Sequence, residues 1–434
     1  MACWLVKKHS DEPRGKDFIL MNKQKGPKTM RYFKLFQMIG LAVGLSLSAS
    51  FAKADDHFAD IVNQAKGQTV YFNAWGGDDK INAYIQWAAD RLKEDYDITL
   101  SHVKLTETAA AVSRVLAEKT AGRDTDGSVD MIWVNGENFA SMLDAGLLQS
   151  QDWVTSLPNW RYTDAQELPA ILLDFAVPTQ GLEVPWGRAQ LAFFYDSAYL
   201  SSPPKNAAAL KDYLSKNRGR FTYPQPPDFI GTSFLKQILI ELTDADPALY
   251  APVEEADFDM ITAPLWAYLE DINPYLWRSG RAYPQNYPSM RQLVSDGELD
   301  IYMAFNPADA SSAIARGELP DTVRSYIHDK GSLANVHFLA ITFNSDSTQA
   351  ARVVANFMLS PEAQIRKADP AIWGDPSVLS QGQLSEEDAA AFAALPKGIA
   401  TLSPAELAKT LPEPHPSWVP KLEAAWQARF ASGQ

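Results

Sequence analysis

The feature that most constrains the fold is an alternation of short apolar segments with amphipathic segments that begins at residue 69. Buried strands are predicted at 69–72, 98–105 and 129–134. Helical stripes are predicted between and after them, over residues 81–92, 112–116 and 139–147. This alternation is typical of an α/β fold, in which a parallel sheet carries helices on both faces.

The middle of the chain has a different texture, because residues 151–190 are rich in Pro and Trp. Further strands are predicted at 190–195, 220–223, 299–305 and 337–343, and further helices from about residue 232 and over 353–358. Residues 375–434 are predicted to be mainly helical and irregular, with the prolines at 412, 414, 416 and 420 acting as breakers.

An export signal is predicted at residues 30–54. Arg31 and Lys34 give a positive start, and an apolar run follows over 35–47. Ala52-Lys53-Ala54 matches the small-x-small rule for signal peptidase, so we expect cleavage after Ala54 and a periplasmic protein. The apolar run is shorter than the roughly 20 residues that span a bilayer, and the alternative is an uncleaved membrane anchor. We interpret the polar residues 1–29 as an over-long translation start.

Removal of residues 1–54 changes the composition in two ways. The only cysteine, Cys3, is lost, so the mature chain cannot form an intramolecular disulfide and is stabilised by its core alone. The mature chain keeps 29 Lys and Arg against 50 Asp and Glu, a net charge of −21. This acidity disfavours nucleic acid and anionic membranes as partners, and we expect a monomer that binds a small molecule.

Candidate ligand-binding residues follow the predicted strands, because ligands of open α/β sheets bind outside the carboxyl ends of the strands. Trp75, Gly76 and Gly77 follow the first strand, and Asn135 and Glu137 follow the third. Asn306 closes the strand at 299–305, and Gly231, Thr232 and Ser233 open a helix. An indole can stack on a ring or a cation, and the N–H groups of a helix start can hold an anion. The alternatives are a tight turn with Asp78 as the N-cap, an N-cap at Thr232 or Ser233, and a first-turn carboxylate at Glu137.

The sequence predicts no catalytic residue, metal site or cofactor. It contains no nucleophile elbow, P-loop or His-Glu-x-x-His motif. No two of the five histidines of the mature chain have the i, i+4 spacing of a helical metal pair. His337 begins an apolar strand and is interpreted as a core residue.

Several short phrases also carry a family resemblance. They are the strand ends at 73–77 and 129–135, the phrase Pro185-Trp186-Gly187, and the phrase Phe-Met-Leu-Ser-Pro-Glu-Ala-Gln at 357–364, which is the most specific. Together they resemble the ABC-transporter extracellular solute-binding proteins of the family 1 type, over nearly all of residues 65–370. Within that family the chain is most similar to the branch named for thiamine transport, which is related to thiamine, iron and polyamine binders.

The resemblance implies a two-lobe periplasmic-binding-protein fold of type II, with lobes joined by crossing hinge strands. We expect residues 55–185 and about 335–370 in the first lobe, and 186–334 with about 371–434 in the second. Ligand contacts to both lobes would favour a closed state, which an ABC permease in the inner membrane recognises.

The resemblance also assigns the candidate residues to lobes. Trp75, Gly76, Gly77 and Asn135 fall on first-lobe loops, Trp186 and Arg188 near the hinge, Gly231, Thr232 and Ser233 on a second-lobe helix start, and Tyr283 and Asn306 on the second-lobe face. The family's iron binders use paired tyrosines, whereas Tyr283 and Tyr287 are spaced by proline and asparagine, which disfavours iron.

These observations favour a non-enzymatic solute-binding component of an ABC importer. The alternatives are an exported hydrolase or lyase on the same fold, which needs an acid–base pair or a nucleophile in the cleft, and a receptor-coupled sensor. Trp75, Trp186 and Tyr283 suit a cationic heteroaromatic such as thiamine. Gly231-Thr232-Ser233 with Arg188 suits a phosphate, phosphonate or carboxylate, and thiamine phosphates would use both sets.

Overall fold

The structure is a computed structural model that describes residues 57–149 and 152–431. Ala54–Gln434 form one compact unit, and the predicted export signal with its cleavage site lies outside the described residues. None of the helices in the described ranges is long and apolar enough to cross a membrane.

The first lobe is built on a mainly parallel sheet. Strand β1 (Thr69–Trp75) pairs in parallel with β2 (Thr99–Leu105) on one side and with β3 (Met131–Val134) on the other. Helices α2 (Asp79–Tyr96), α3 (Ala109–Thr120) and α4 (Glu137–Asp144) connect or follow these strands. The strands and helices predicted between residues 69 and 147 are confirmed.

Helix α2 shows why the alternation forms. Asp78 caps its start, because the carboxylate accepts hydrogen bonds from the backbone N–H groups of Lys80 and Ile81. The stripe predicted from the sequence faces the core, where Leu92 and its companions are fully buried. Asp97 ends the helix in the left-handed conformation, with a φ of 54°.

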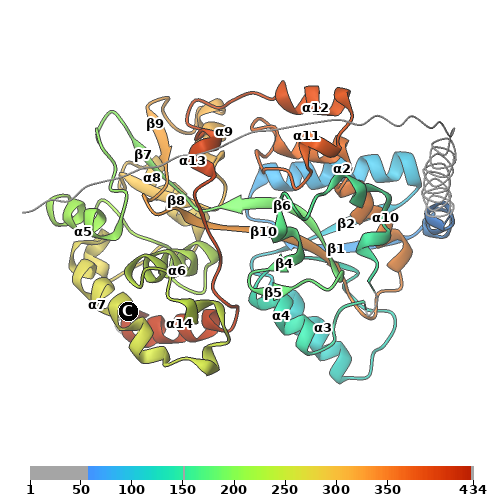
Figure 1. Ribbon diagram of the computed structural model, residues 1–434, viewed down its shortest axis with the longest axis horizontal. Helices are drawn as coiled ribbons and strands as arrows, with labels where there is room; N and C mark the ends of the chain where they lie inside the picture. The colour runs from blue at the N-terminus through green and yellow to red at the C-terminus, as the bar shows by residue number, and fades with distance from the viewer. Residues whose placement is uncertain (1–56, 150–151, 432–434) are drawn as a thin grey trace, which may run out of the picture. The chain divides into compact units, whose positions relative to one another are not determined.

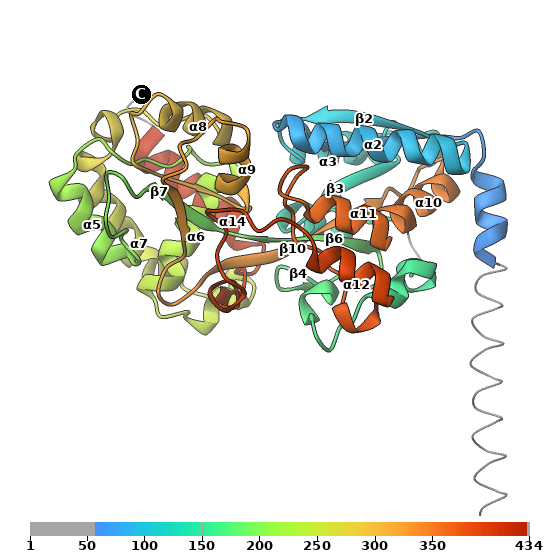
Figure 2. The same ribbon diagram turned by 90° about the horizontal axis from the view of Figure 1, so that it is seen from above.

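Two long strands cross between the lobes (Figures 1 and 2). Strand β6 (Glu183–Gln190) runs antiparallel to β10 (Ser332–Ile341), with Ala340 opposite Glu183 and Ala334 opposite Gln190. Strand β10 also pairs antiparallel with β3, so it belongs to the first-lobe sheet, in the order β11-β10-β3-β1-β2. Strand β6 contains Pro185-Trp186-Gly187 and ends at Gln190, so the crossing precedes most of the strand predicted at 190–195.

The second lobe has a smaller sheet of three antiparallel strands, in the order β8-β7-β9. Its strands are β7 (Ala192–Asp196), β8 (Ile301–Ala304) and β9 (Val323–Tyr326). The remaining short strands are β4 (Leu173–Asp174), β5 (Val177–Pro178) and β11 (Thr410–Leu411). Further α-helices among the described residues are α5 (Ala207–Lys216), α6 (Phe229–Leu242), α7 (Phe258–Ile272), α8 (Tyr287–Ser295), α9 (Asp309–Ala315), α10 (Thr348–Met358), α11 (Pro361–Ala368), α12 (Glu386–Ala393), α13 (Pro404–Leu407) and α14 (Trp418–Trp426).

The strand predicted at 220–223 is wrong. This segment joins none of the sheets among the described residues. Two of its carbonyl groups bond outside any strand: Arg220 O accepts from Asp300 N–H and Phe221 O accepts from Trp277 N–H. The prolines that follow at 224, 226 and 227 cannot donate to a ladder, so the segment ends without strand partners.

Each lobe has its own hydrophobic core. The second-lobe core draws its members from residues 191–333 and 400–426, and the first-lobe core from 58–186 and 336–379. Trp373, Val378 and Leu379 belong to the first core, and α12 packs on α11 beside it (Figure 2). The prediction that all of 371–434 lie in the second lobe is therefore wrong for residues 371–393, because these apolar side chains bury against the first core.

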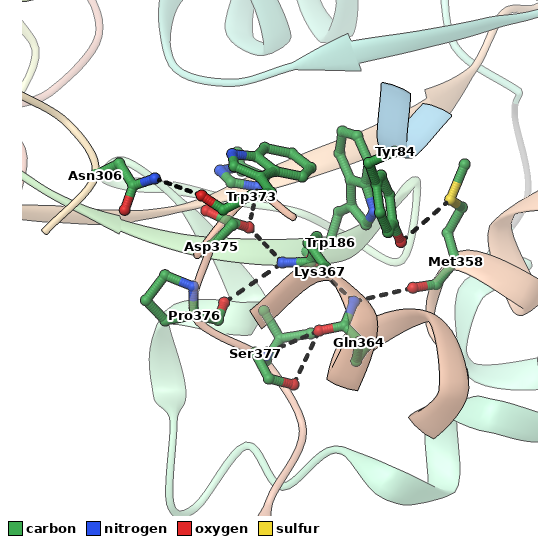
Figure 3. Close-up of polar contacts among 12 residues, drawn as sticks. Tyr84, Trp186, Asn306, Met358, Gln364, Lys367, Trp373, Asp375, Pro376 and Ser377 are labelled. Atoms are coloured by element: carbon green, nitrogen blue, oxygen red, sulfur yellow. Dashed lines mark hydrogen bonds and ion pairs between the residues drawn. The ribbon is translucent and has the colours of Figure 1, made fainter. Parts of the chain in front are cut away.

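The segment 357–364 connects neighbouring elements through the buried hydrogen bonds of Gln364, which Figure 3 shows. Ser360 caps α11 and Pro361 occupies its first turn. The buried Gln364 donates from Nε2 to the carbonyls of Trp186 and Met358. Its Oε1 accepts from the Ser377 hydroxyl and the Val378 N–H. One amide thus ties α11 to the crossing strand β6 and to the returning chain.

We predict that Gln364→Ala lowers the free energy of unfolding by about 2–4 kcal/mol, because it leaves buried donors and acceptors unpaired. Urea unfolding of the purified protein measures this loss. The exposed Gln383 provides the matched control, and Gln383→Ala is expected to unfold as wild type does. Equal free energies of unfolding for Gln364→Ala and wild type would contradict this stabilising role of Gln364.

Candidate ligand-binding cleft

A cavity of about 250 Å³ opens between the two lobes, at the carboxyl ends of the first-lobe strands. The first lobe contributes the residues that follow β1, β2 and β3, including Trp75, Glu107 and Asn135. The second lobe contributes the start of α6, the end of β8 and two side chains of α14. Strand ends therefore position this site, as the rule for open α/β sheets predicts.

Five of the predicted site residues line the cavity: Trp75, Asn135, Glu137, Thr232 and Asn306. Gly76 and Gly77 do not line it; Gly76 packs against the side chain of Lys104, and Gly77 packs against Trp75. A Cβ on Gly77 would come within 2.4 Å of the Trp75 ring, so this glycine leaves room for the indole. Asn306 is held in place, because its Oδ1 accepts from Ala308 N–H at 2.9 Å.

Trp186 and Tyr283 do not line the cavity, which corrects the sequence prediction. Trp186 is fully buried and packs edge-on against Trp133 and Trp373, with ring centroids 5.1 and 5.2 Å away. Both of these partners line the cavity, so Trp186 supports its aromatic wall from behind. Tyr283 packs in the second-lobe core and donates its hydroxyl to Asn273.

Arg188 is also outside the main cavity. Successive side chains of a strand point to opposite faces, and its neighbour Ala189 lines the main cavity. Arg188 instead lines a second cavity of about 260 Å³, together with Glu167, Ser380 and Phe392. The predicted pairing of Arg188 with the start of α6 is therefore wrong.

The start of α6 is already occupied by a carboxylate of the chain. Asp228 Oδ1 accepts from the N–H groups of Ile230 and Gly231, and its Oδ2 accepts from Tyr287 N–H. Gly231 packs against the Pro224 carbonyl, which a Cβ would approach to 2.0 Å, and Ser233 is fully buried. Gly231 and Ser233 are thus packing residues, and the helix start offers no free N–H pair for an anion.

The wall behind the cavity contains a buried charged group. Lys367 pairs with Asp375, and Nε2 of His337 lies 3.1 Å from Oδ2 of the same carboxylate. Burial alone would raise the pKa of Asp375, but His337 and Lys367 hold this pKa below its usual value. A Cβ on Gly187 would meet the Asp375 carboxylate at 1.9 Å, which explains the glycine in Pro185-Trp186-Gly187.

The charge of the cavity was not predicted. Glu107 and Glu423 line it from opposite lobes, near Glu137 and Asp228. Desolvation in the cleft, increased by these neighbouring charges, raises the pKa of Glu107 to about 7. Desolvation likewise raises the pKa of Glu423 to about 7. Glu107 follows a strand end, so the rule that found Trp75 could have found it, whereas no local signal marks Glu423 on α14.

Across residues 57–149 and 152–431, no group of three His, Cys, Asp or Glu side chains is placed to hold a metal ion. Tyr287 was compared above with the paired tyrosines of the family's iron binders. Its hydroxyl donates to Asp309 at 2.6 Å.

Two buried carboxyls lie beneath the first-lobe part of the site. Asp174 accepts from the Gly136 N–H at 2.7 Å and so fixes the turn between Asn135 and Glu137. Gly136 adopts a φ of 61°, and a Cβ there would meet the Phe175 ring at 2.6 Å. Neither oxygen of the buried Glu183 has a hydrogen-bond partner among the described residues. Burial, with the Asp174 charge added, raises the pKa of Glu183 well above its usual value.

Comparisons with known proteins agree with this geometry. Residues 87–396 match the family model described as bacterial extracellular solute-binding protein. The chain is 46% identical to protein YnjB of Escherichia coli (strain K12) over 393 residues, which cover 91% of this chain and 99% of that protein.

Solved structures show the same fold at low identity. The periplasmic binding protein AfuA from Actinobacillus pleuropneumoniae, with fructose-6-phosphate bound, has a TM-score of 0.58 and 14% identity, covering 84% of this chain and 99% of its own. The spermidine/putrescine-binding protein PotD from Streptococcus pneumoniae has a TM-score of 0.58, 15% identity and the same coverage. A periplasmic thiamin binding protein has a TM-score of 0.58 and 17% identity, covering 84% and 96%. The predicted two-lobe α/β fold is confirmed.

We predict that Glu183 makes the stability of the protein depend on pH. Its folded pKa is raised above the unfolded value of about 4.3, so the folded state holds the proton longer. The free energy of unfolding should therefore fall as pH rises above that value, by at most about 1.4 kcal/mol per pH unit. Glu183→Gln should flatten this fall.

Urea unfolding at pH 5 to 9 measures the effect, and the exposed Glu387→Gln serves as the matched control. The same slope in wild type and in Glu183→Gln would show that Glu183 does not carry the pH dependence.

Proposed function

Since the chain belongs to the bacterial extracellular solute-binding proteins, which serve ABC transporters, we propose that it carries thiamine or a related cationic heteroaromatic. The supporting observation is an interlobe cavity lined by aromatic side chains from both lobes. Trp75, Trp133 and Trp373 come from the first lobe and Phe229 and Phe305 from the second. Flat rings on both walls suit stacking on a heterocycle and attraction of its positive charge.

The acidic lining supports a cation rather than an anion. The N–H groups at the start of α6 are bound to Asp228, and the carboxylates of Glu107, Glu137 and Glu423 line the same cavity. An anionic ligand would meet this negative field without free helix N–H groups to offset it. A thiamine-like cation fits it better than a thiamine phosphate or a phosphonate does.

Hinge closure is the proposed mechanism of delivery. Strands β6 and β10 join the lobes, and a ligand between Trp75 and Phe229 would contact both lobes at once. Such contacts exist only when the lobes approach each other, so the ligand favours the closed state, which the inner-membrane permease of the importer would recognise.

A binding role is favoured over a hydrolase or lyase role. The Thr232 hydroxyl donates to Glu423 at 2.8 Å, the geometry that an activated nucleophile would need. The helix N–H groups that could stabilise an oxyanion beside it are taken by Asp228, however. We therefore interpret the Thr232–Glu423 contact as a means of orienting the carboxylate, and infer that the protein is not an enzyme.

We predict export with removal of residues 1–54. Mass spectrometry of the protein isolated from the periplasm should show Asp55 at the amino terminus, because Ala52-Lys53-Ala54 suits signal peptidase. Protein that keeps Met30, or that is found in the cytoplasm, would contradict the periplasmic role.

We predict that Trp75→Ala weakens thiamine binding roughly tenfold or more, because loss of one stacked cation–π partner costs about 1–2 kcal/mol. Isothermal titration calorimetry with thiamine measures the affinity, and the melting temperature of the empty variant should match wild type. Trp277→Ala is the matched control, since Trp277 lies on the second lobe outside the cavity. Equal affinities for Trp75→Ala and wild type would make Trp75 a packing residue only.

A further inference from the structure

We propose that Glu107, Glu137 and Glu423 form a cation subsite that reaches across both lobes, and that a ligand cation bound there displaces protons from it. This inference rests on the proposed function and adds to it the carboxylates that select a positively charged solute. It also names a second property of the ligand, a positive centre with N–H donors or a charged ring nitrogen.

The three carboxylates come from three separate elements. Glu107 lies in the turn between β2 and α3, and Glu137 is the first residue of α4, both in the first lobe. Glu423 lies on α14 in the second lobe. All three line the same cavity, and closure of the lobes would bring their like charges closer together. A cation between them would convert this repulsion into attraction to both lobes.

The chain leaves these charges without a counter-ion. Among the described residues the Glu107 carboxylate has no hydrogen bond or ion pair, and the Glu137 carboxylate accepts from the Asn138 side chain and from its own backbone N–H. Glu423 accepts from the Thr232 hydroxyl, which is neutral. The subsite is thus acidic, and Lys236 offsets only part of its charge.

The cationic side chains that line the cavity are engaged elsewhere. The buried Lys236 pairs with Glu413 at 2.6 Å. Arg316 pairs with Glu318, and Lys80 donates to the Pro370 carbonyl at 2.9 Å. Releasing any of them toward the subsite would break an existing bond, so a ligand is the better source of positive charge.

A separate observation also points to a donor on the ligand. Asn335 lines the cavity and is 8% exposed. Its Nδ2 donates to Glu413 at 3.0 Å, which fixes the amide orientation, because an ionised carboxylate only accepts. The Oδ1 is then a buried acceptor without a donor among the described residues. An N–H group of a ligand would donate a hydrogen bond to this oxygen, whereas an anionic ligand without N–H or O–H groups would not.

The groups that surround the subsite keep protons on it in the empty protein. Glu107 faces Asp228, Glu423 and Glu137, whose charges add to desolvation and raise its pKa to about 7. Glu137 has a raised pKa because of burial, and Lys236 only partly offsets this. A bound cation favours the charged carboxylates, so it lowers their pKa and releases protons near neutral pH. Affinity for a cation should therefore rise as pH rises through 7.

Calorimetry with thiamine as the probe tests the subsite. For one carboxyl of pKa about 7 that must ionise, affinity should rise about tenfold between pH 6 and pH 8. Titrations in two buffers of different ionisation enthalpy should report protons released at pH 6.5. Glu107→Gln and Glu423→Gln should each lower the affinity at pH 8 and reduce the number of protons released. Glu94→Gln, an exposed change on α2, is the matched control and should behave as wild type.

Other outcomes separate the subsite from the proposed function. Thiamine binding that is independent of pH and of Glu107→Gln would overturn the subsite and leave thiamine carriage intact. If thiamine fails to bind, putrescine is the second cationic probe, and its binding with proton release would uphold the subsite against the thiamine proposal. A carbon-13 titration of the glutamate carboxyls in the empty protein needs no ligand. The Glu107→Gln and Glu423→Gln variants assign the carboxyl resonances. Titration of both Glu107 and Glu423 near pH 4.5 would overturn the subsite.

Discussion

The antiparallel pairing of β6 with β10 is the constraint on which the rest of the structure depends. Strand β10 pairs with β3 in the first lobe and begins beside the second-lobe core, where Gln237 of α6 accepts from the Leu333 N–H. Strand β6 leads directly into β7 of the second-lobe sheet. Because the two strands bond to each other along most of their length, they connect the lobes as one ribbon. The two hydrophobic cores are joined by these crossing strands and by the segment that runs from the first-lobe core to residues 400–426 of the second-lobe core. The cavity lies between the two cores.

Two groups of buried polar side chains stabilise the cavity wall next to the β6–β10 strand pair. Gln364 ties α11 to the carbonyl of Trp186, and Asp375 joins Lys367 to His337 across Gly187. Removing one member of such a buried ionic group would leave an unpaired charge, which is costly in a low-dielectric interior. These groups therefore fix the position of Trp186 and, through it, of the rings that face the solute.

Much of the fold could be predicted from the sequence, because local pattern decides it. The stripe that ends at Leu92 and the apolar strand that leads to Trp75 carry their own periodicity, so both were placed correctly. The segment 220–223 looked like a strand by the same criterion. Whether a segment is a strand depends on partners far away in sequence, however, and Phe221 O bonds to Trp277 in a loop instead.

The site could be predicted only in part, for a related reason. Trp75, Asn135 and Asn306 follow strands, and the position of a strand end is a local property. Trp186 lies on the crossing strand β6, but its ring is buried in the first-lobe core, and periodicity does not reveal which face of a crossing strand is covered. Glu423 lies on a helix nearly 350 residues from Trp75, and only the folded chain brings the two to one cavity.

The central claim is that one solute is held by both lobes between aromatic walls and the acidic subsite. A crystal structure of the protein grown with thiamine tests this most directly. We expect electron density for the ligand in the interlobe cavity, with its ring against Trp75 and its positive charge nearest Glu107 and Glu423. Density that contacts one lobe only, or that lies in the second cavity beside Arg188, would contradict the account.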